Sequence, residues 1–179
     1  MDNILLVILA SMSPIAELRG GIPLGLALGL PLETVLITAI LFNCLIFFPV
    51  YFGLDLLYER FFSRYRWARN LMENMRKKGK AYVDKYEMIG LAIFVGIPLP
   101  LTGAWTGTGI AWVLGLDWKK SFLSVSAGVV IAACIVTAAY FLLLTLVNAF
   151  SLGVFLLSLC LLAYVVYLKS MKEKWLFFR

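Results

Sequence analysis

The chain has 179 residues, of which 63% are hydrophobic and 15% are charged, and its 16 Lys and Arg against 10 Asp and Glu give a formal charge of +6. Soluble domains average about 45–50% apolar and about 25% charged residues, so this composition excludes a soluble globular protein and predicts an integral membrane protein. The sequence has no histidine, which excludes His-based catalytic triads and His metal sites, and we expect no metal and no cofactor.

The first predicted element is a broken apolar stretch at residues 4–30. It is about one membrane crossing long, and an interruption at mid-length is typical of a helix that enters the bilayer, turns and leaves on the same side. We therefore expect a re-entrant helical hairpin here rather than a complete span. The residues that interrupt the stretch are Pro14, Glu17, Arg19, Gly20, Gly21 and Pro23.

Residues 34–58 form the first uninterrupted apolar stretch, which as a helix is long enough to cross a hydrocarbon core of about 30 Å. Asn43 predicts a polar lining or a packing contact within this span, and Pro49 predicts a kink. Asp55 lies near the end of the span, where it either pairs with an arginine at the membrane surface or serves as a second proton carrier.

A basic linker follows at residues 59–87, and the positive-inside rule places it in the cytoplasm. Apolar residues recur in it at a 4-3-4-3 spacing and form one face of a predicted amphipathic helix at the membrane interface. This helix either anchors the chain to anionic lipid or gathers acidic headgroups. The residues of its apolar face are Phe61, Tyr65, Ala68, Met72 and Met75.

The second broken apolar stretch lies at residues 88–116. If it crossed the membrane, Lys119, Lys120 and the basic C-terminal tail would face outward, whereas a re-entrant hairpin keeps them on the side of the linker. We therefore expect a second hairpin, followed by spans at residues 121–147 and 152–168 that a short turn around Asn148 joins. The residues that interrupt this stretch are Pro98, Pro100, Thr102 and Gly103.

An internal repeat relates the two broken stretches when the chain is displaced by 86 positions. Each stretch is followed by a long span, and the two spans run in opposite directions, which predicts an inverted repeat. The alternative is chance alignment of Gly and Pro in an apolar sequence of low diversity. The aligned pairs are Pro14 with Pro100, Gly21 with Gly107, Gly25 with Ala111, Gly29 with Gly115, and Leu30 with Leu116.

The sequence thus predicts an all-α integral membrane protein with a single membrane domain at residues 1–179. Its predicted parts are the first hairpin with its transmembrane helix at 3–58, the linker at 59–87, the inverted second hairpin with its helix at 88–147, and an extra C-terminal transmembrane helix with a basic tail at 150–179. Small residues at every fourth position in the second arm of each hairpin predict close packing between helices.

Glu17 and Arg19 are the ionisable residues inside the first hairpin, and such residues are costly at hydrocarbon depth unless they are paired, hydrated or functional. In a structural interpretation, they neutralise each other. In a functional one, Arg19 joins the amides of Gly20 and Gly21 in an anion site at a helix N-terminus. Glu17 then takes up and releases a proton. The second hairpin would line the same cavity with Thr102, Gly103, Trp105 and Thr106.

The runs ELRGGIP at residues 17–23 and IPLPLTGAWTG at residues 97–107 resemble the small multidrug export protein family, a branch of the DedA-like (VTT/SNARE-associated) membrane superfamily. The resemblance covers residues 14–147. It implies two inverted hairpin-plus-helix units whose tips meet near the membrane midplane. Relatives in the superfamily are associated with moving lipids across membranes, including polyprenyl phosphate recycling and phospholipid scrambling, often with a dependence on proton motive force. Glu17 and Arg19 match the acidic and basic positions of the first hairpin.

We therefore expect a transporter, specifically a translocase for an anionic lipid such as a polyprenyl phosphate or a phospholipid, coupled to protons through Glu17. Two alternatives remain: a proton-coupled exporter of small hydrophobic cations, and a non-transporting scaffold in which Glu17 and Arg19 are a structural pair. We expect no enzyme activity and no catalytic residues, because the spans hold no Ser/Lys pair and no facing aspartates. The expected partners are membrane lipids and protons, with a homodimer left open and nucleic acid excluded. The expected location is the plasma membrane, with the linker and the C-terminus cytoplasmic.

Overall fold

A computed structural model describes residues 2–83, 87–99 and 102–177, and their side chains except at 62, 68, 71, 77–83, 87 and 162–177. The described residues are helical or lie in turns and contain no strand, which confirms the predicted all-α class. Two apolar helical segments are long enough to cross a membrane, Leu32–Phe61 and Trp118–Leu161. The chain forms two compact units, Met1–Ala138 and Ala139–Arg179. The first unit holds every helix up to the beginning of the last one.

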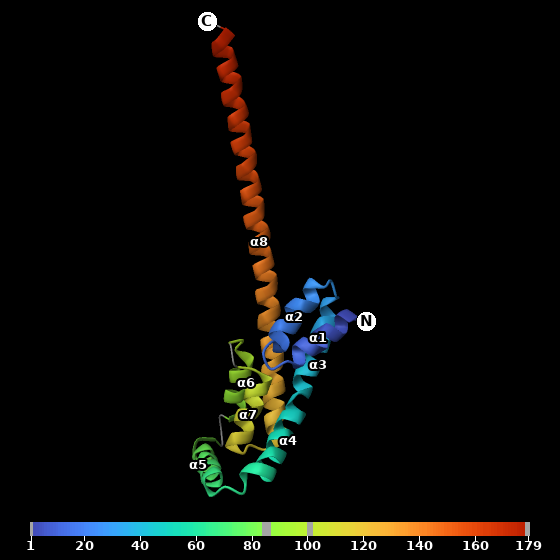
Figure 1. The fold of residues 1–179 in the computed structure, drawn as a ribbon, viewed down its shortest axis with the longest axis vertical. Coiled ribbons are helices and arrows are strands. Elements are labelled where there is room, and N and C mark those ends of the chain that lie inside the picture. Colours follow the sequence, from blue (N-terminus) through green and yellow to red (C-terminus); the bar gives the residue numbers. More distant parts are fainter. Residues whose placement is uncertain (1, 84–86, 100–101, 178–179) are drawn as a thin grey trace. The chain divides into compact units, whose positions relative to one another are not determined.

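The first unit begins with two short helices, α1 (Asp2–Met12) and α2 (Glu17–Ala27), which pack against each other and against α3 (Leu32–Leu45) (Figure 1). Their approach is close because Gly25 has no side chain: a Cβ there would lie 2.7 Å from Val35 and 2.9 Å from Val7. Residues 13–16, which include Pro14, separate α1 from α2 and are called the first break below. A break predicted at Pro23 is wrong, since α2 continues through it and only the hydrogen bond to the carbonyl of Arg19 is lost.

The first candidate span consists of α3, α4 (Phe47–Leu57) and a π-helical turn, η1 (Tyr58–Phe62). Helix α3 ends at Leu45, the residue whose carbonyl would receive the N–H that Pro49 lacks, so the helix is interrupted where Pro49 predicts a kink. The linker helix α5 (Arg66–Val83) begins later than its apolar spacing predicted. Phe61 belongs to η1, which Ser63 closes with a 2.8 Å hydrogen bond from its N–H to the carbonyl of Tyr58.

The second half of the unit contains α6 (Glu87–Gly96), α7 (Ala104–Leu114) and the beginning of α8 (Trp118–Phe177). Residues 97–103 separate α6 from α7 and are called the second break below. Glycines again allow close packing: a Cβ at Gly107 would overlap Val95, and one at Gly128 of α8 would lie 2.6 Å from the same valine. Helix α8 begins where the Asp117 carboxylate accepts hydrogen bonds from the N–H groups of Lys119 and Lys120.

The same helix end occurs in both halves of the first unit. Gly29 after α2 and Gly115 after α7 have φ values of 75° and 69°, a left-handed conformation that glycine adopts without strain. In each case the next N–H closes the helix with a 3.1 Å bond, from Leu30 to Gly25 and from Leu116 to Ala111. Helices α3 and α8 then begin at Leu32 and Trp118. All of these equivalent positions are 86 residues apart, the displacement that aligns the two broken stretches of the sequence.

Helix α8 continues through Asn148, so the turn predicted there is wrong and residues 121–168 form one helix rather than two spans. The segment contains no proline, and the hydroxyl groups of Thr145 and Ser151 donate back to the carbonyls of Leu142 and Asn148, so these polar side chains are satisfied within the helix. In the second unit, the described large apolar side chains from residue 141 to residue 161 are exposed. Such a surface fits lipid rather than water.

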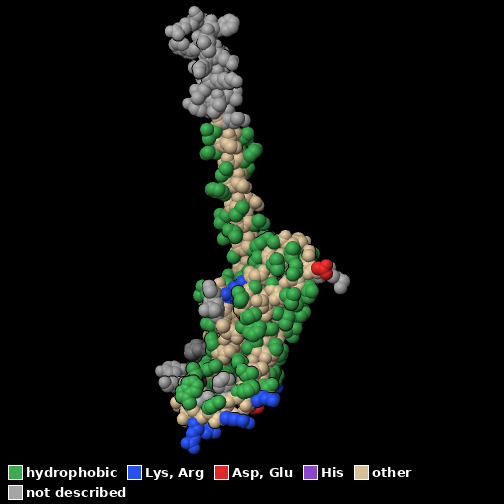
Figure 2. All heavy atoms as spheres, in the orientation of Figure 1, with side chains coloured by type: hydrophobic (Ala, Val, Ile, Leu, Met, Phe, Trp, Pro, Cys, Tyr) green, Lys and Arg blue, Asp and Glu red, His purple; other side chains and the backbone are tan. Residues whose placement is uncertain are grey.

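Charged side chains are distributed unevenly over the first unit. Figure 2 shows Lys and Arg side chains gathered over α5 and the adjoining end of α4, whereas hydrophobic side chains dominate the face over α3 and α4. The arginines at this end, Arg60, Arg64, Arg66 and Arg69, are exposed. This distribution is typical of a membrane protein with one basic surface at the interface.

Candidate functional site

Glu17 lies directly after the first break, in a conformation that is unusual for its residue type. Its φ of 48° is in the left-handed region, and it is the described non-glycine residue with a positive φ. A side chain larger than that of glycine adds about 1–3 kcal/mol of strain in such a conformation, and strained residues of this kind cluster at functional sites. The residue is only 7% exposed, so this strained conformation accompanies a carboxylate that is buried inside the protein.

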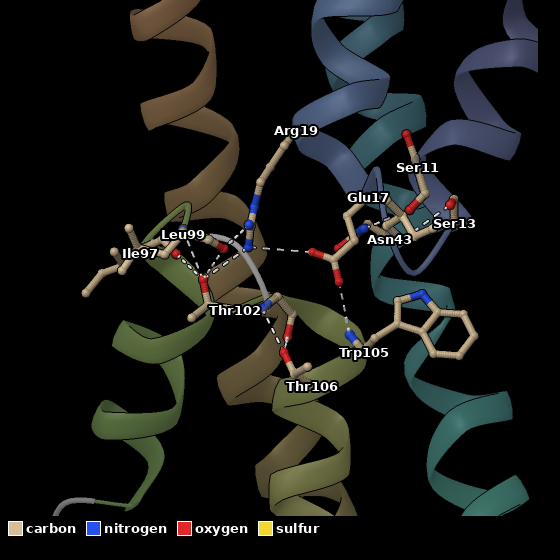
Figure 3. A network of polar contacts seen from close by, with 12 residues as sticks. Ser11, Ser13, Glu17, Arg19, Asn43, Ile97, Leu99, Thr102, Trp105 and Thr106 are labelled. Atoms are coloured by element: carbon tan, nitrogen blue, oxygen red, sulfur yellow. Dashed lines mark hydrogen bonds and ion pairs between the residues drawn. The ribbon is translucent and has the colours of Figure 1, made fainter.

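The Glu17 carboxylate lies at the N-terminus of α7 (Figure 3). The backbone N–H of Trp105, the second residue of α7, donates to Glu17 Oε1 at 3.4 Å. Gly103 precedes the helix, and a Cβ at that position would overlap the carboxylate, so only glycine leaves room for Glu17. Unpaired N–H groups and the helix dipole favour an anion at a helix N-terminus. Glu17 therefore occupies an anion-binding position in this structure.

Arg19 joins the two breaks from the side of α2 (Figure 3). Its guanidinium donates to the carbonyl of Leu99 and, at 3.1 Å, to Thr102 Oγ1. It is also 3.8 Å from Glu17 Oε2, and its side chain is 22% exposed. Thr102 Oγ1 additionally lies 2.6 Å from the carbonyl of Ile97, so this hydroxyl organises the second break. Arg19 thus lies close to a backbone carbonyl, a hydroxyl and a carboxylate, while part of its side chain stays accessible to solvent or to a ligand.

The carboxyl end of α1 is closed by side chains from two other helices. Asn43 Nδ2 of α3 donates to the carbonyl of Ser11 at 2.8 Å, and Trp105 Nε1 of α7 donates to that of Met12 at 3.1 Å. Ser11 and Asn43 are fully buried, and neither Ser11 Oγ nor Asn43 Oδ1 has a hydrogen-bond partner among the described residues. The site therefore has a polar interior beside Glu17.

The contacts between the two breaks are approximately reciprocal. Glu17 and Gly103 are 86 positions apart, as are Arg19 and Trp105. Glu17 lies against Gly103, while the side chains of Arg19 and Trp105 each donate to a backbone carbonyl on the opposite side, that of Leu99 and that of Met12. Residues 86 positions apart therefore make similar contacts from opposite sides of the site.

The family comparison matches residues 17–135, two thirds of the chain, to the family described as "Putative small multi-drug export protein". The chain belongs to this family. The matched segment begins at Glu17 and includes the whole second break. The family description is that of an export protein, which is a transporter rather than an enzyme. Neither the curated proteins nor the solved structures that were compared with the chain contain a match.

In this export-family chain, the structure brings together most of the predicted site residues. Thr106 completes the set, because its hydroxyl accepts the N–H of Gly103 at 3.1 Å. Pro14 lies in the first break and Pro98 in the second, while Pro100 lies outside the described residues. The predicted residues that lie together here are Glu17, Arg19, Thr102, Gly103, Trp105 and Thr106, and their role in binding stays a prediction.

Three predicted residues have other roles. The N–H of Gly20 is bonded to the carbonyl of Ala16 at 2.9 Å, so this amide is not free for the predicted anion site. Gly21 instead packs against α1, where a Cβ would overlap Ser11 Oγ. Asp55 accepts a 3.2 Å hydrogen bond from Trp112 Nε1 near the carboxyl end of α7, one helix length from Glu17. The helix N-terminus that holds an anion is that of α7, not that of α2.

Sequence reasoning missed the role of Ser11 and of the Leu99 carbonyl, and it identified Asn43 only as a polar residue in a span. Asn43 was the detectable signal, since an amide in an apolar helix needs a partner. Ser11 gave no signal, because serine is frequent in membrane helices and only the fold brings it against Gly21.

Replacing Asn43 with leucine, which has a similar volume, is expected to lower the thermal stability of this export-family protein. The change leaves the carbonyl of Ser11 without its buried donor, which costs about 1–3 kcal/mol. Thermal unfolding in detergent measures the effect, with Asn148→Leu as the control because Asn148 is exposed on α8. Equal melting temperatures for the two variants would contradict the assigned cap.

Proposed function

We propose that this protein is a translocase for an anionic lipid, such as a polyprenyl phosphate or a phospholipid, and that it is coupled to protons. The observation that carries the proposal is the Glu17 carboxylate at the N-terminus of α7, 3.8 Å from a partly accessible Arg19. The Glu17 carboxylate already occupies the position that a phosphate would take. The Arg19 guanidinium beside it belongs to a group that binds phosphate in bidentate geometry. Membership of an export family supports transport.

The proposed architecture is a DedA-like pair of inverted repeats. Each repeat would consist of a re-entrant hairpin, α1–α2 or α6–α7, followed by a transmembrane helix. The matching helix ends at Gly29 and Gly115 and the reciprocal contacts across the site support it, because related units should repeat both local structure and contacts. The proposed boundaries are residues 3–58 for the first repeat, 59–87 for the linker, and 88–147 for the second repeat.

In the proposed mechanism, a lipid headgroup replaces Glu17. A headgroup phosphate enters between the breaks, bonds to Arg19 and Thr102, and takes over the Trp105 N–H. Two anions cannot share this position, so Glu17 withdraws and takes up a proton, which it loses when it returns after the headgroup has left. The lipid tail stays in the bilayer throughout. Asp55, bonded to Trp112, would exchange protons near the basic linker.

We propose a plasma-membrane location with the linker in the cytoplasm, since the exposed arginines of η1 and α5 gather at one end of the first unit. Association into a homodimer is also part of the proposal.

The second candidate function is export of small hydrophobic cations, which the family description favours. In that case Glu17 itself would bind the cation. Its present contacts with the Trp105 N–H and Arg19 suit the binding of an anion in its place, because a cation beside Arg19 would be repelled.

Reconstitution of the full chain in vesicles tests the two functions directly. We expect the wild type to transfer headgroup-labelled phosphatidylglycerol and a polyprenyl phosphate between leaflets, faster with a proton gradient than without one. Glu17→Gln should lose the dependence on the gradient. Empty vesicles and vesicles with Asn148→Leu are the controls. Movement of a lipophilic cation, with no transfer of either lipid, would favour the exporter and refute the translocase.

A further inference from the structure

An apolar groove lies beside the polar site, between α5, α6 and α7. Its volume is about 550 Å³, within the range of about 300–1,000 Å³ that is usual for ligand sites. No charged side chain lines it among the described residues. It is lined by Met75, Phe94, Thr106, Gly109, Ile110, Val113 and Leu114.

The groove is open along one side. Ile110 is 39% exposed and Met75 is 43% exposed, although both line the groove. A Cβ placed on Gly109 would meet no atom within 4 Å, so the backbone of α7 borders empty space at this point. If α6 and α7 lie within the bilayer, as proposed above, this open side would face hydrocarbon, and a ligand could enter from the lipid without passing through water.

The groove is continuous with the polar site through Thr106. Its hydroxyl binds the N–H of Gly103, which is in contact with the Glu17 carboxylate, while the residue also lines one end of the groove. From Thr106 to Leu114 the groove follows about 12 Å of α7. The far end meets Met75 on α5, the helix of the basic linker.

A polar site beside an apolar groove fits a lipid, with a charged headgroup and a hydrocarbon tail, better than it fits other ligands. A headgroup bound to Arg19 and Thr102 would place the beginning of its tail near Thr106, the residue at one end of the groove. A hydrophobic cation in the groove itself would find no carboxylate, and an unpaired charge in an apolar environment is costly. We propose that the groove binds the hydrocarbon chain of the transported lipid. This inference rests on the proposed function and specifies the chain as part of what the protein recognises.

Filling the groove at Gly109 tests the proposal without disturbing the core. Gly109→Trp adds a ring to open space, and Gly90→Trp is the matched control, because Gly90 is also a helical glycine with open space around it and does not line the groove. The probe is phosphatidylglycerol with a diazirine on its acyl chain, added to vesicles that contain the full protein. Peptide mapping then measures labelling of residues 106–114.

We expect labelling of these residues in the wild type and in Gly90→Trp, and about a fivefold loss in Gly109→Trp, because the indole removes the apolar surface that holds the chain. Transfer of long-chain phosphatidylglycerol should fall in Gly109→Trp, while transfer of a short-chain analogue with the same headgroup should be retained. Unchanged labelling in Gly109→Trp would overturn the proposal.

The outcomes separate this inference from the proposed function. If the wild type transfers no lipid but Gly109→Trp still loses chain labelling, the groove is a chain-binding site and the translocase proposal fails. If Arg19→Ala abolishes lipid transfer while Gly109→Trp changes neither labelling nor transfer, the translocase stands and the groove proposal is wrong. Loss of labelling on addition of a lipophilic cation, with no competition by unlabelled phosphatidylglycerol, would also overturn it.

Discussion

Replacing Arg19 with alanine is expected to reduce the transfer of an anionic lipid by about 10- to 100-fold, because the variant loses a charge-assisted hydrogen bond worth about 1.5–3 kcal/mol at the proposed headgroup site. Arg19→Lys should retain part of the activity, since lysine keeps the charge but cannot form the bidentate hydrogen bonds of a guanidinium. The measurement is the initial rate of leaflet transfer of labelled phosphatidylglycerol in vesicles.

The control for this prediction is Arg69→Ala, which removes an exposed arginine of α5 and should leave the rate within about twofold, as is usual for surface substitutions. The scaffold alternative makes a different prediction. If Glu17 and Arg19 were only a structural pair, exchanging them as Glu17→Arg with Arg19→Glu would preserve both stability and function. Retained transfer in that exchange variant would rule out the role of Arg19 in binding.

Replacing Gly103 with alanine is expected to destabilise the first unit, by about 1–3 kcal/mol or more, because the new methyl group would overlap the Glu17 carboxylate and push it away from α7. The loss should appear both in thermal unfolding in detergent and in lipid transfer. Gly90→Ala is the matched control on α6, because a Cβ there meets open space, helix propensity favours alanine, and Gly90 does not line the groove. A wild-type melting temperature for Gly103→Ala would contradict the close contact.

An exchange variant tests whether Glu17 and Gly103 are equivalent positions of a repeat. In Glu17→Gly with Gly103→Glu, the carboxylate approaches the site from the opposite side, and glycine fits the left-handed backbone at position 17 without strain. The double variant should therefore be more stable than Gly103→Glu alone, which places two carboxylates together. A double variant that is no more stable would argue against the symmetric arrangement.

Local signals in the sequence predicted where the helices of the first unit end. Pro14 and Pro49 lack N–H groups, so each acts through its own backbone, whereas the left-handed helix end at Gly115 was not predicted. The prediction of a turn at Asn148 was wrong. A single polar residue does not end a helix in lipid, because every backbone group there needs a hydrogen bond. Pro23 was overestimated for the same reason.

The site could be predicted in its residue types but not in its geometry. Glu17 and Arg19 stood out because charge is costly in an apolar segment. Which helix N-terminus holds the carboxylate depends on tertiary packing, and the decisive feature, the missing side chain at Gly103, cannot be distinguished in sequence from other glycines of a membrane helix. The groove beside α7 was also hidden, since its lining comes from three helices that no local pattern relates.

The hydrogen bonds between the two breaks have a consequence for the conformational equilibrium of the protein. Arg19 bonds to Leu99 and Thr102, and Trp105 bonds to Glu17 and Met12, so these contacts hold the site closed. At a net value of about 0.5–1.5 kcal/mol for each bond, parting the breaks costs a few kcal/mol. A parted form would then be a minor state, populated at about 0.1–10% or less, and would exchange with the closed form on the timescale of about microseconds to milliseconds that is usual for such motions. Turnover would be limited by how often this minor state forms.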